Sequence, residues 1–323
     1  MADTLQRQMQ VQDEHIGLRL DQVARLWLQD FSREQVKSWI EAGALLYQGR
    51  QARPSLRVAA GAELRLDVEL TARTEAQAEN IPLQLVYEDE DILVIDKPAG
   101  LVVHPGAGNW QGTLMNALLY HEPGLAALPR AGIVHRLDKE TSGLLVVART
   151  AQAQEQLIAQ LKDRSLRRIY QAFVCGVPPA QGEVDAAIGR HPQDRLRMAI
   201  RPEGKEARTH FQRLAVYGSF SHIELRLATG RTHQIRVHMS HLGHPLLGDP
   251  VYRPPRACLL SAGPALQAQL VHFQRQALHA SELGLLHPRL GRPLSWHSPL
   301  PDDLLNLQQA LCADAHAKSA RQA

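Results

Sequence analysis

The chain has 323 residues, of which 44% are hydrophobic and 21% charged, as in ordinary globular proteins with room for two or three domains. No apolar run approaches the roughly 20 residues of a membrane span, and the polar N-terminus does not resemble a signal peptide, so a cytoplasmic protein is expected. Cys175, Cys258 and Cys312 are far apart and outside any C-x-x-C pairing, which predicts neither a disulfide framework nor a thiolate zinc site.

The net charge of +3 is distributed unevenly along the chain. Residues 1–100 hold 11 Lys and Arg against 17 Asp and Glu, whereas residues 161–256 hold 16 against 8. A basic stretch inside a globular protein is typical of a surface that follows phosphates. A solvated face that binds no polyanion has the same composition, so charge alone leaves both interpretations open.

A small α+β unit is predicted at residues 15–70, after a flexible N-terminus at residues 1–14. Apolar residues recur at helical spacing over residues 18–27. A second helix is predicted to begin with Ser32 as N-cap, because Gln35 three residues later completes a capping-box pattern.

Short strands are predicted after these two helices. Residues 45–47 lead into a turn, and residues 64–68 alternate apolar with charged side chains, which indicates strands with one buried face. Arg33 and Lys37 are four positions apart and therefore share one face of the second helix. They are candidate RNA ligands, or merely solvated residues of a small packing domain.

The remainder of the chain is predicted to be a linker, a larger domain and a tail. Residues 71–80 lack apolar residues other than alanine, which is typical of a linker. In residues 81–312, strand-like runs broken by Pro and Gly outnumber the one clear helix at residues 151–161. This predicts an α+β domain on a mixed or antiparallel sheet with flanking helices. Residues 313–323 are small and polar, and a disordered tail is expected.

The most informative segment is R-A-G-I-V-H-R-L-D-K-E-T-S-G-L-L at residues 130–145. It places His135, Arg136 and Asp138 in a short loop before an apolar strand, which is how a rigid sheet holds a site. From residue types alone, a structural histidine and a surface aspartate are the more common interpretation. The segment is therefore a candidate site whose chemistry the residue types do not define.

The motif H-R-L-D-x-x-T-S-G-L-L resembles the signature of the RluA-type pseudouridine synthases. Residues 15–70, in the order of their elements, resemble an S4 RNA-binding domain. Further segments resemble the same family in the same order: G-L-V-V-H-P-G at 100–106, R-I-Y-Q-A at 168–172, T-G-R-T-H-Q-I-R-V-H at 229–238, G-D-P-V-Y at 248–252 and L-H-A at 278–280. One departure is G-L-L at 284–286, where the family pattern has an aromatic residue, and it concerns packing more than chemistry.

The resemblance implies an enzyme that converts uridine to pseudouridine by flipping the base out of the RNA, with no cofactor and no metal. Asp138 would be the catalytic carboxylate, paired with Arg231, which would lower the pKa of Asp138. Tyr170 would stack on the target base, Arg136 would fill the vacancy in the RNA, and Ile235 would pack under the flipped base. Further RNA contacts are expected from His135, Arg236 and the basic residues Arg164, Arg167, Arg168, Arg190, Arg195, Arg197 and Arg208.

The resemblance also implies the partner, which is 23S rRNA or a precursor of the large ribosomal subunit, with the helix 69 stem-loop as the target. A monomer is expected. Uridines elsewhere in ribosomal or transfer RNA remain an alternative. A non-catalytic RNA-binding factor in ribosome assembly is a second alternative, but it would be expected to lack Asp138, Arg231 or Tyr170, which are all present.

Metal and nucleotide sites are disfavoured by the sequence. His233, His238, His241 and His244 are close enough in sequence to suggest metal ligands, but no Cys and no H-E-x-x-H pattern accompanies them. The Gly-rich residues 106–112 match neither G-x-G-x-x-G nor a P-loop, and a turn is expected there.

Overall fold

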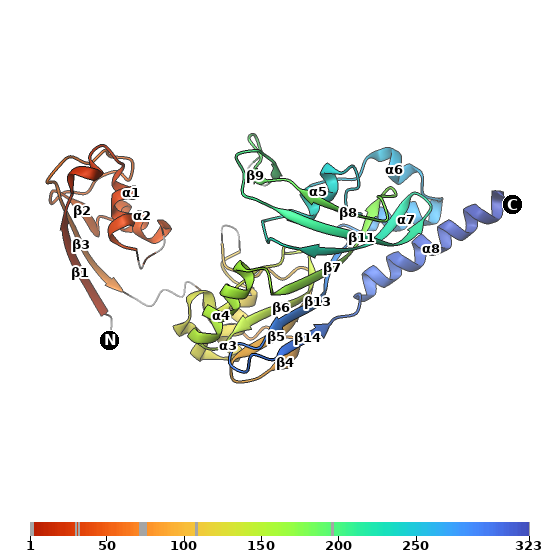
Figure 1. The fold of residues 1–323 in the computed structure, drawn as a ribbon, viewed down its shortest axis with the longest axis horizontal. Coiled ribbons are helices and arrows are strands. Elements are labelled where there is room, and N and C mark those ends of the chain that lie inside the picture. Colours follow the sequence, from red (N-terminus) through yellow and green to blue (C-terminus); the bar gives the residue numbers. More distant parts are fainter. Residues whose placement is uncertain are drawn as a thin grey trace. The chain divides into compact units, whose positions relative to one another are not determined.

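The computed structural model describes residues 3–29, 31, 33–70, 76–106, 109–194 and 197–322. The chain divides into two compact units, Met1–Thr74 and Glu75–Ala323, and Figure 1 shows the elements of each. Both units combine helices with antiparallel or mixed sheets, so the predicted α+β class is confirmed.

The smaller unit packs two helices on a three-stranded antiparallel sheet with the strand order β1-β3-β2. Leu20 and Val23 of the first helix and Val36 and Ile40 of the second share one core with the sheet. The predicted N-cap Ser32 lies outside the described residues. The elements are β1 (Asp3–Gln10), the 3-10 helix η1 (Asp13–His15), α1 (Leu20–Trp27), α2 (Arg33–Glu41), β2 (Leu45–Tyr47) and β3 (Glu63–Leu70).

The flexible N-terminus expected at residues 1–14 is wrong for most of its length. Residues 3–10 form β1, which pairs with β3 over eight successive residues, and Leu5 and Met9 pack against the core. The strand carries few apolar residues, and its partner lies about sixty residues later in the chain. Its stability comes from main-chain pairing, which leaves little trace in the local hydrophobic pattern.

The larger unit is built on a nine-stranded sheet with the order β4-β5-β6-β13-β7-β12-β11-β8 and with β14 added to β13, as far as the described residues define it. The β6–β13 pair is parallel and the others are antiparallel, which confirms the predicted mixed sheet. The strands are β4 (Leu85–Glu88), β5 (Ile92–Lys97), β6 (Ser142–Ala148), β7 (Arg167–Cys175), β8 (Gln181–Asp185), β11 (Arg208–Tyr217), β12 (Phe220–Leu227), β13 (Leu278–Leu286) and β14 (Pro293–His297), besides the separate hairpin of β9 (Ile188–Arg190) and β10 (Met198–Ile200).

Helices cover both faces of this sheet. In Figure 1, α8 continues from the blue strands as the long helix that ends the chain. The helices are α3 (Leu114–His121), η2 (Pro123–Ala127), η3 (Pro129–Gly132), α4 (Ala151–Lys162), α5 (Gln234–His241), α6 (Arg256–Leu260), α7 (Pro264–His272) and α8 (Asp302–Gln322). None of the described helices has the length and apolar character needed to cross a membrane.

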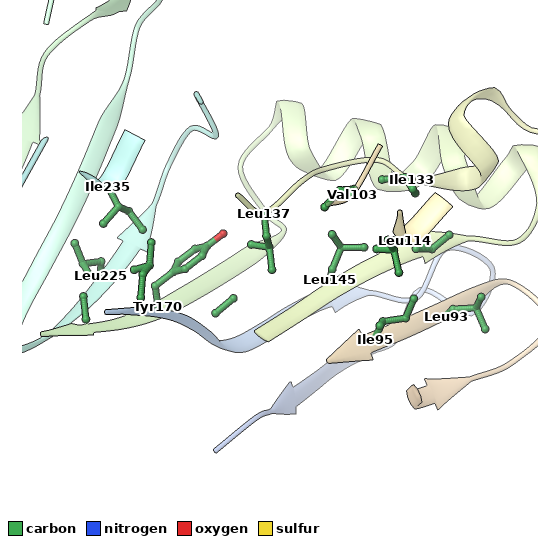
Figure 2. Packing of buried hydrophobic residues seen from close by; sticks show 14 of the residues in the cluster. Leu93, Ile95, Val103, Leu114, Ile133, Leu137, Leu145, Tyr170, Leu225 and Ile235 are labelled. Atoms are coloured by element: carbon green, nitrogen blue, oxygen red, sulfur yellow. The ribbon is translucent and has the colours of Figure 1, made fainter. Parts of the chain in front are cut away.

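Strand β6 is the centre of the larger unit, because all seven of its residues are buried. Leu145 and Val147 face a core shared with β5 and α3, part of which Figure 2 shows. Leu144 and Val146 face a second core under α4. A strand covered on both faces reads as a continuous apolar run, and that is how the sequence G-L-L-V-V-A reads. The H-R-L-D loop is therefore anchored at the most buried strand of the unit.

The segment predicted as a linker packs in part against the larger unit. Ala76 is buried in the core of that unit. Asn116 of α3 donates from Nδ2 to the carbonyl of Gln77 (2.7 Å), and its own carbonyl accepts from the N–H of Glu79 (3.0 Å). Both hydrogen bonds involve Asn116, one through its side-chain amide and one through its main-chain carbonyl, and the composition of residues 71–80 could not indicate them.

The disordered tail expected at residues 313–323 is also wrong, because α8 continues to Gln322. Alanine-rich sequence favours helix, Asp314 and Lys318 form an i,i+4 ion pair, and Asp314 accepts from the N–H of Gly263 (2.7 Å).

The cysteine prediction needs the same kind of correction. Cys175 at the end of β7 and Cys258 in α6 are joined by a disulfide, with Cα atoms 6.2 Å apart. The two residues are separated by 83 positions in sequence, so their proximity is a product of the fold and not of any spacing.

Candidate active site

A cavity of about 530 Å³ opens where the H-R-L-D loop, the start of β7 and the turn before α5 meet. These three segments lie far apart in sequence and are brought together by the sheet. Their side chains include eight of the predicted site residues: Asp138, His135, Arg136, Tyr170, Arg168, Arg231, Ile235 and Arg236.

Asp138 is paired with Arg236 and not, as predicted, with Arg231. Arg236 Nη1 donates to Asp138 Oδ2 at 3.0 Å, whereas Arg231 Nε donates to the carbonyl of Glu206 at 2.9 Å. Arg236 lies in α5, on the buried side of that helix, and Arg231 lies in the turn that precedes it. The segment R-T-H-Q-I-R contains both arginines. Which of them points towards Asp138 depends on where helix α5 begins.

Arg236 is shared between two carboxylates. Its Nε and Nη2 donate to Asp249 at 2.7 and 2.9 Å, in addition to the bond with Asp138. Burial alone would lower the pKa of Arg236, but the two carboxylates outweigh it and hold that pKa above its ordinary value. Asp249 was not among the predicted site residues, although it lies in the segment G-D-P-V-Y that resembles the family. The planar guanidinium thus holds Asp138 next to a buried side chain that a second carboxylate also binds.

The cavity wall contains strained backbone. Among the described residues other than glycine, five have positive φ, and three of these, Arg130, Arg164 and His233, line the cavity. Arg130 is the first of three successive left-handed residues, followed by Ala131 and Gly132. A Cβ at Gly132 would lie 1.9 Å from the carbonyl oxygen of Ala148, so glycine is required there. Such strain persists where the surrounding structure enforces it, and it is frequent at functional sites.

Tyr170 forms the apolar side of the cavity together with Ile235. Both side chains are buried, at 5% and 4% exposure, in the core that also contains Leu137. In Figure 2 the hydroxyl end of Tyr170 points towards Leu137, the residue before Asp138. Burial raises the pKa of the Tyr170 phenol, which therefore stays neutral at physiological pH. A neutral ring beside an aliphatic side chain is suited to stacking on a flat base.

Arg168 is a buried cation, and its Nε has no hydrogen-bond partner among the described residues. Burial lowers its pKa. A Cβ on Gly230 would lie 2.8 Å from Arg168 Nη1, so this glycine leaves room for the guanidinium. The neighbouring His135 accepts from the N–H of Val146 at 3.2 Å, and burial followed by the charge of Arg168 lowers its pKa to about 3. The positive charge of Arg168, next to the neutral ring of His135, is therefore available to bind an anion.

The other basic residues named from the sequence differ in their surroundings. Arg136 is exposed at the cavity beside Asp138. Lys37, in α2 of the smaller unit, forms an ion pair with Glu41, while the side chain of Arg33 and the whole of Arg195 lie outside the described residues. Several others are engaged by the protein itself: Arg164 with Glu206, Arg167 with Glu282, Arg208 with Asp185, and Arg197 with the ring of Tyr252.

Asp89, Asp91 and His287 form a cluster away from the cavity, with potential metal-binding atoms within 4.8 Å of one another. His287 Nδ1 accepts from the N–H groups of Arg289 (3.2 Å) and Leu290 (3.1 Å). Its Nε2 therefore carries the proton and donates to Asp89 Oδ2 at 2.8 Å. A protonated ring nitrogen offers no lone pair, so this cluster is a hydrogen-bond network that joins β13 and β4 through their flanking loops.

The histidines of the basic stretch are also engaged. Both ring nitrogens of His238 form hydrogen bonds, Nδ1 with Thr209 Oγ1 (2.9 Å) and Nε2 with the carbonyl of Ala186 (3.0 Å). His244 Nδ1 bonds with the carbonyl of Cys175 (3.0 Å). These two side chains serve the packing of α5 and the loop after it.

The chain belongs to the RNA pseudouridine synthase family, as comparison with known proteins shows. The family model described as RNA pseudouridylate synthase matches residues 91–241. The chain is 50% identical to ribosomal large subunit pseudouridine synthase D of Pseudomonas aeruginosa, over 98% of this chain and 99% of that protein. It is 49% identical to the protein of the same name from Xanthomonas campestris, over 97% and 95%. The resemblance of the sequence motifs to the RluA-type pseudouridine synthases is confirmed.

Solved structures agree with this assignment. The human protein RNA pseudouridylate synthase domain containing 4 is 27% identical, with a TM-score of 0.56 over 71% of this chain and 92% of that one. The human protein RNA pseudouridylate synthase domain containing 1 is also 27% identical, with a TM-score of 0.51 over 73% of this chain and 97% of that one. The shared part has the size of the larger unit, which holds the cavity.

Proposed function

We propose that this chain isomerises uridines of large-subunit ribosomal RNA, with Asp138 as the catalytic carboxylate. The observation that carries the proposal is the pairing of Asp138 with Arg236 on the floor of a cavity walled by Tyr170. The names of the relatives, which cover nearly the whole chain, supply the substrate class. Among those uridines, we propose the ones of the helix 69 stem-loop in 23S rRNA.

The reaction requires little from the protein beyond positioning. The N1–C1′ bond breaks, the uracil turns over and C5 bonds to C1′. The hydrogen on C5 leaves as a proton to water and the freed N1 takes up a proton, so the product is an isomer and no electrons enter or leave. A carboxylate can take part as a nucleophile or as a base at the ribose. Arg236 orients that carboxylate, because its other two donors are held by Asp249. The detached uracil is retained between Tyr170 and Ile235.

RNA binding uses positions around the cavity. Arg168, which is buried and has no carboxylate partner among the described residues, receives a phosphate of the target strand. Arg136, exposed beside Asp138, enters the RNA where the base has left the stack. The smaller unit, whose elements follow the order of an S4 domain, adds contacts through Arg33 and Lys37. The same proposal includes a monomeric enzyme that acts in the cytoplasm on 23S rRNA or a precursor of the large subunit.

The test uses large-subunit RNA carrying tritium at uracil C5, since formation of the new C–C bond must release that hydrogen to water. The variant Asp138→Asn, which keeps shape and removes charge, is the control. Release by the wild-type chain and none by Asp138→Asn, with RNA affinity intact, is the expected result. Release from transfer RNA but not from large-subunit RNA would move the substrate elsewhere. Binding without release from any RNA would favour a non-catalytic assembly factor.

A further inference from the structure

The residues that follow Asp138 are held by buried side chains that do not line the cavity. The carbonyl of Lys139 accepts from Lys97 Nζ (3.0 Å) and from the N–H of Gly100 (2.9 Å). The carbonyl of Glu140, the next residue, accepts from Arg275 Nη1 (3.1 Å). Two buried side chains from different parts of the chain, those of Lys97 and Arg275, thus bind two successive carbonyls directly after the catalytic position.

The remaining groups of this turn are fixed as well. The N–H of Thr141 donates to the carbonyl of Asp138 (3.0 Å), and Thr141 Oγ1 accepts from Gln276 Nε2 (3.0 Å). Ser142 Oγ bonds with His279 Nδ1 (3.0 Å). Arg236 therefore fixes the carboxylate of Asp138 from the side chain, and a separate set of contacts fixes its main chain.

Arg275 is in turn held by the C-terminal helix. Asp303, in the first turn of α8, accepts from Arg275 Nη2 at 2.9 Å and from Nε at 2.5 Å. Arg275 is 8% exposed, so its geometry is set by these bonds and by the carbonyls that its Nη1 reaches. Asp303 is thus connected to Glu140 through one planar side chain.

We propose that Arg275 is a positioning residue for Asp138, and that Asp303 of α8 acts through it. The proposal rests on the proposed role of Asp138. Displacing a reacting group by about 1 Å can cost two orders of magnitude in rate, so a loosened Glu140 carbonyl should slow the reaction. Lys97, Arg275 and Asp303 are not among the residues that line the cavity, so RNA affinity should not change with them.

The experiment compares two adjacent acids of the same helix turn. Asp303→Asn removes the charge that holds Arg275, and Asp302→Asn makes the same change at an exposed neighbour with the same relation to the helix dipole. Single-turnover tritium release and RNA affinity are measured for both in the full-length protein, per folded molecule. We expect Asp303→Asn to lower the rate about tenfold with RNA affinity unchanged, and Asp302→Asn to change neither.

A second variant tests the route of the effect. Arg275→Lys keeps the charge but loses the fork, and the double variant with Asp303→Asn should react no more slowly than Arg275→Lys alone, because both act through one contact. Multiplying effects in the double variant would overturn the route through Arg275. A lower melting temperature of Asp303→Asn with an unchanged rate would leave α8 a purely structural role, as would an equal loss from Asp302→Asn.

The same assay separates this proposal from the proposed function. If Asp138→Asn retains the wild-type rate, the catalytic role of Asp138 is refuted, and the positioning role of Arg275 is refuted with it. If Asp138→Asn is inactive and Asp303→Asn is fully active, the catalytic role stands and the positioning role is refuted.

Discussion

Replacing Arg236 by lysine should slow pseudouridine formation far more than the same change at Arg231. Arg236 reaches Asp138 and Asp249 at once, whereas Arg231 donates to a single main-chain carbonyl. A lysine ammonium keeps the charge but cannot present the planar fork that bridges the two carboxylates. The pair of variants therefore separates the inward-facing arginine from its neighbour in the same segment.

The expected loss of rate can be calculated from one lost hydrogen bond. A lysine at position 236 that reaches Asp249 cannot also bind Asp138. A hydrogen bond to a charged group contributes about 1.5 to 3 kcal/mol, and each 1.36 kcal/mol in the barrier is about a factor of ten in rate. Arg236→Lys should therefore lower the single-turnover rate by about 10- to 150-fold. It should also destabilise the fold, because the Asp249 side chain is completely buried and loses a bidentate partner. For Arg231→Lys we expect a change of less than about twofold in rate.

The assay is single-turnover tritium release at saturating RNA, with thermal unfolding of each variant recorded in parallel. Saturation removes effects on RNA affinity, and the unfolding curves identify any loss that comes from an unfolded fraction. If Arg231→Lys is the slower enzyme while both variants remain folded, the assignment of Arg236 as the partner of Asp138 is refuted.

Three further changes test other parts of the structure. Arg168→Met should weaken RNA binding without loss of thermal stability. The slope of the logarithm of the binding constant against the logarithm of the salt concentration should fall in magnitude by about one, and an unchanged slope would exclude a phosphate contact. For Asp89, burial opposes ionisation, but hydrogen bonds led by that from Tyr87 lower its pKa from 3.8 to about 2. The ionised carboxylate of Asp89 should therefore contribute about 2 kcal/mol to the free energy of unfolding above pH 4, and this contribution should be lost as the pH falls towards 2. In Asp89→Asn, acid unfolding should lack this part of the pH dependence. Arg130→Gly should raise stability by about 1 kcal/mol in denaturant unfolding, because glycine relieves the left-handed backbone.

The sequence predicted the mixed sheet and the position of Asp138 because both depend on local patterns. The apolar run of β6 and the polar loop before it identify a site on a buried strand without knowledge of the rest of the fold. The family resemblance then supplied the proposed catalytic role of Asp138 and the candidates Tyr170 and Arg136. Each of these lines the cavity.

What the sequence did not predict depends on contacts between distant residues. The choice between Arg231 and Arg236 required the first residue of α5 and the position of Asp249. Strand β1 depends on pairing with β3, and the end of α8 depends on packing and an internal ion pair. Local propensity contains little of this information, because tertiary pairing decides it.

The burial of β6 also bears on how the enzyme fails when heated. All residues of β6 are buried. Core strands typically open only in the global unfolding of a domain, so we expect β6 to be among the last parts of the larger unit to unfold. The loop that carries Asp138 ends where β6 begins, and β6 pairs with the neighbouring strands β5 and β13. Heat inactivation should therefore coincide with global unfolding of the larger unit, without a folded but inactive stage at lower temperature.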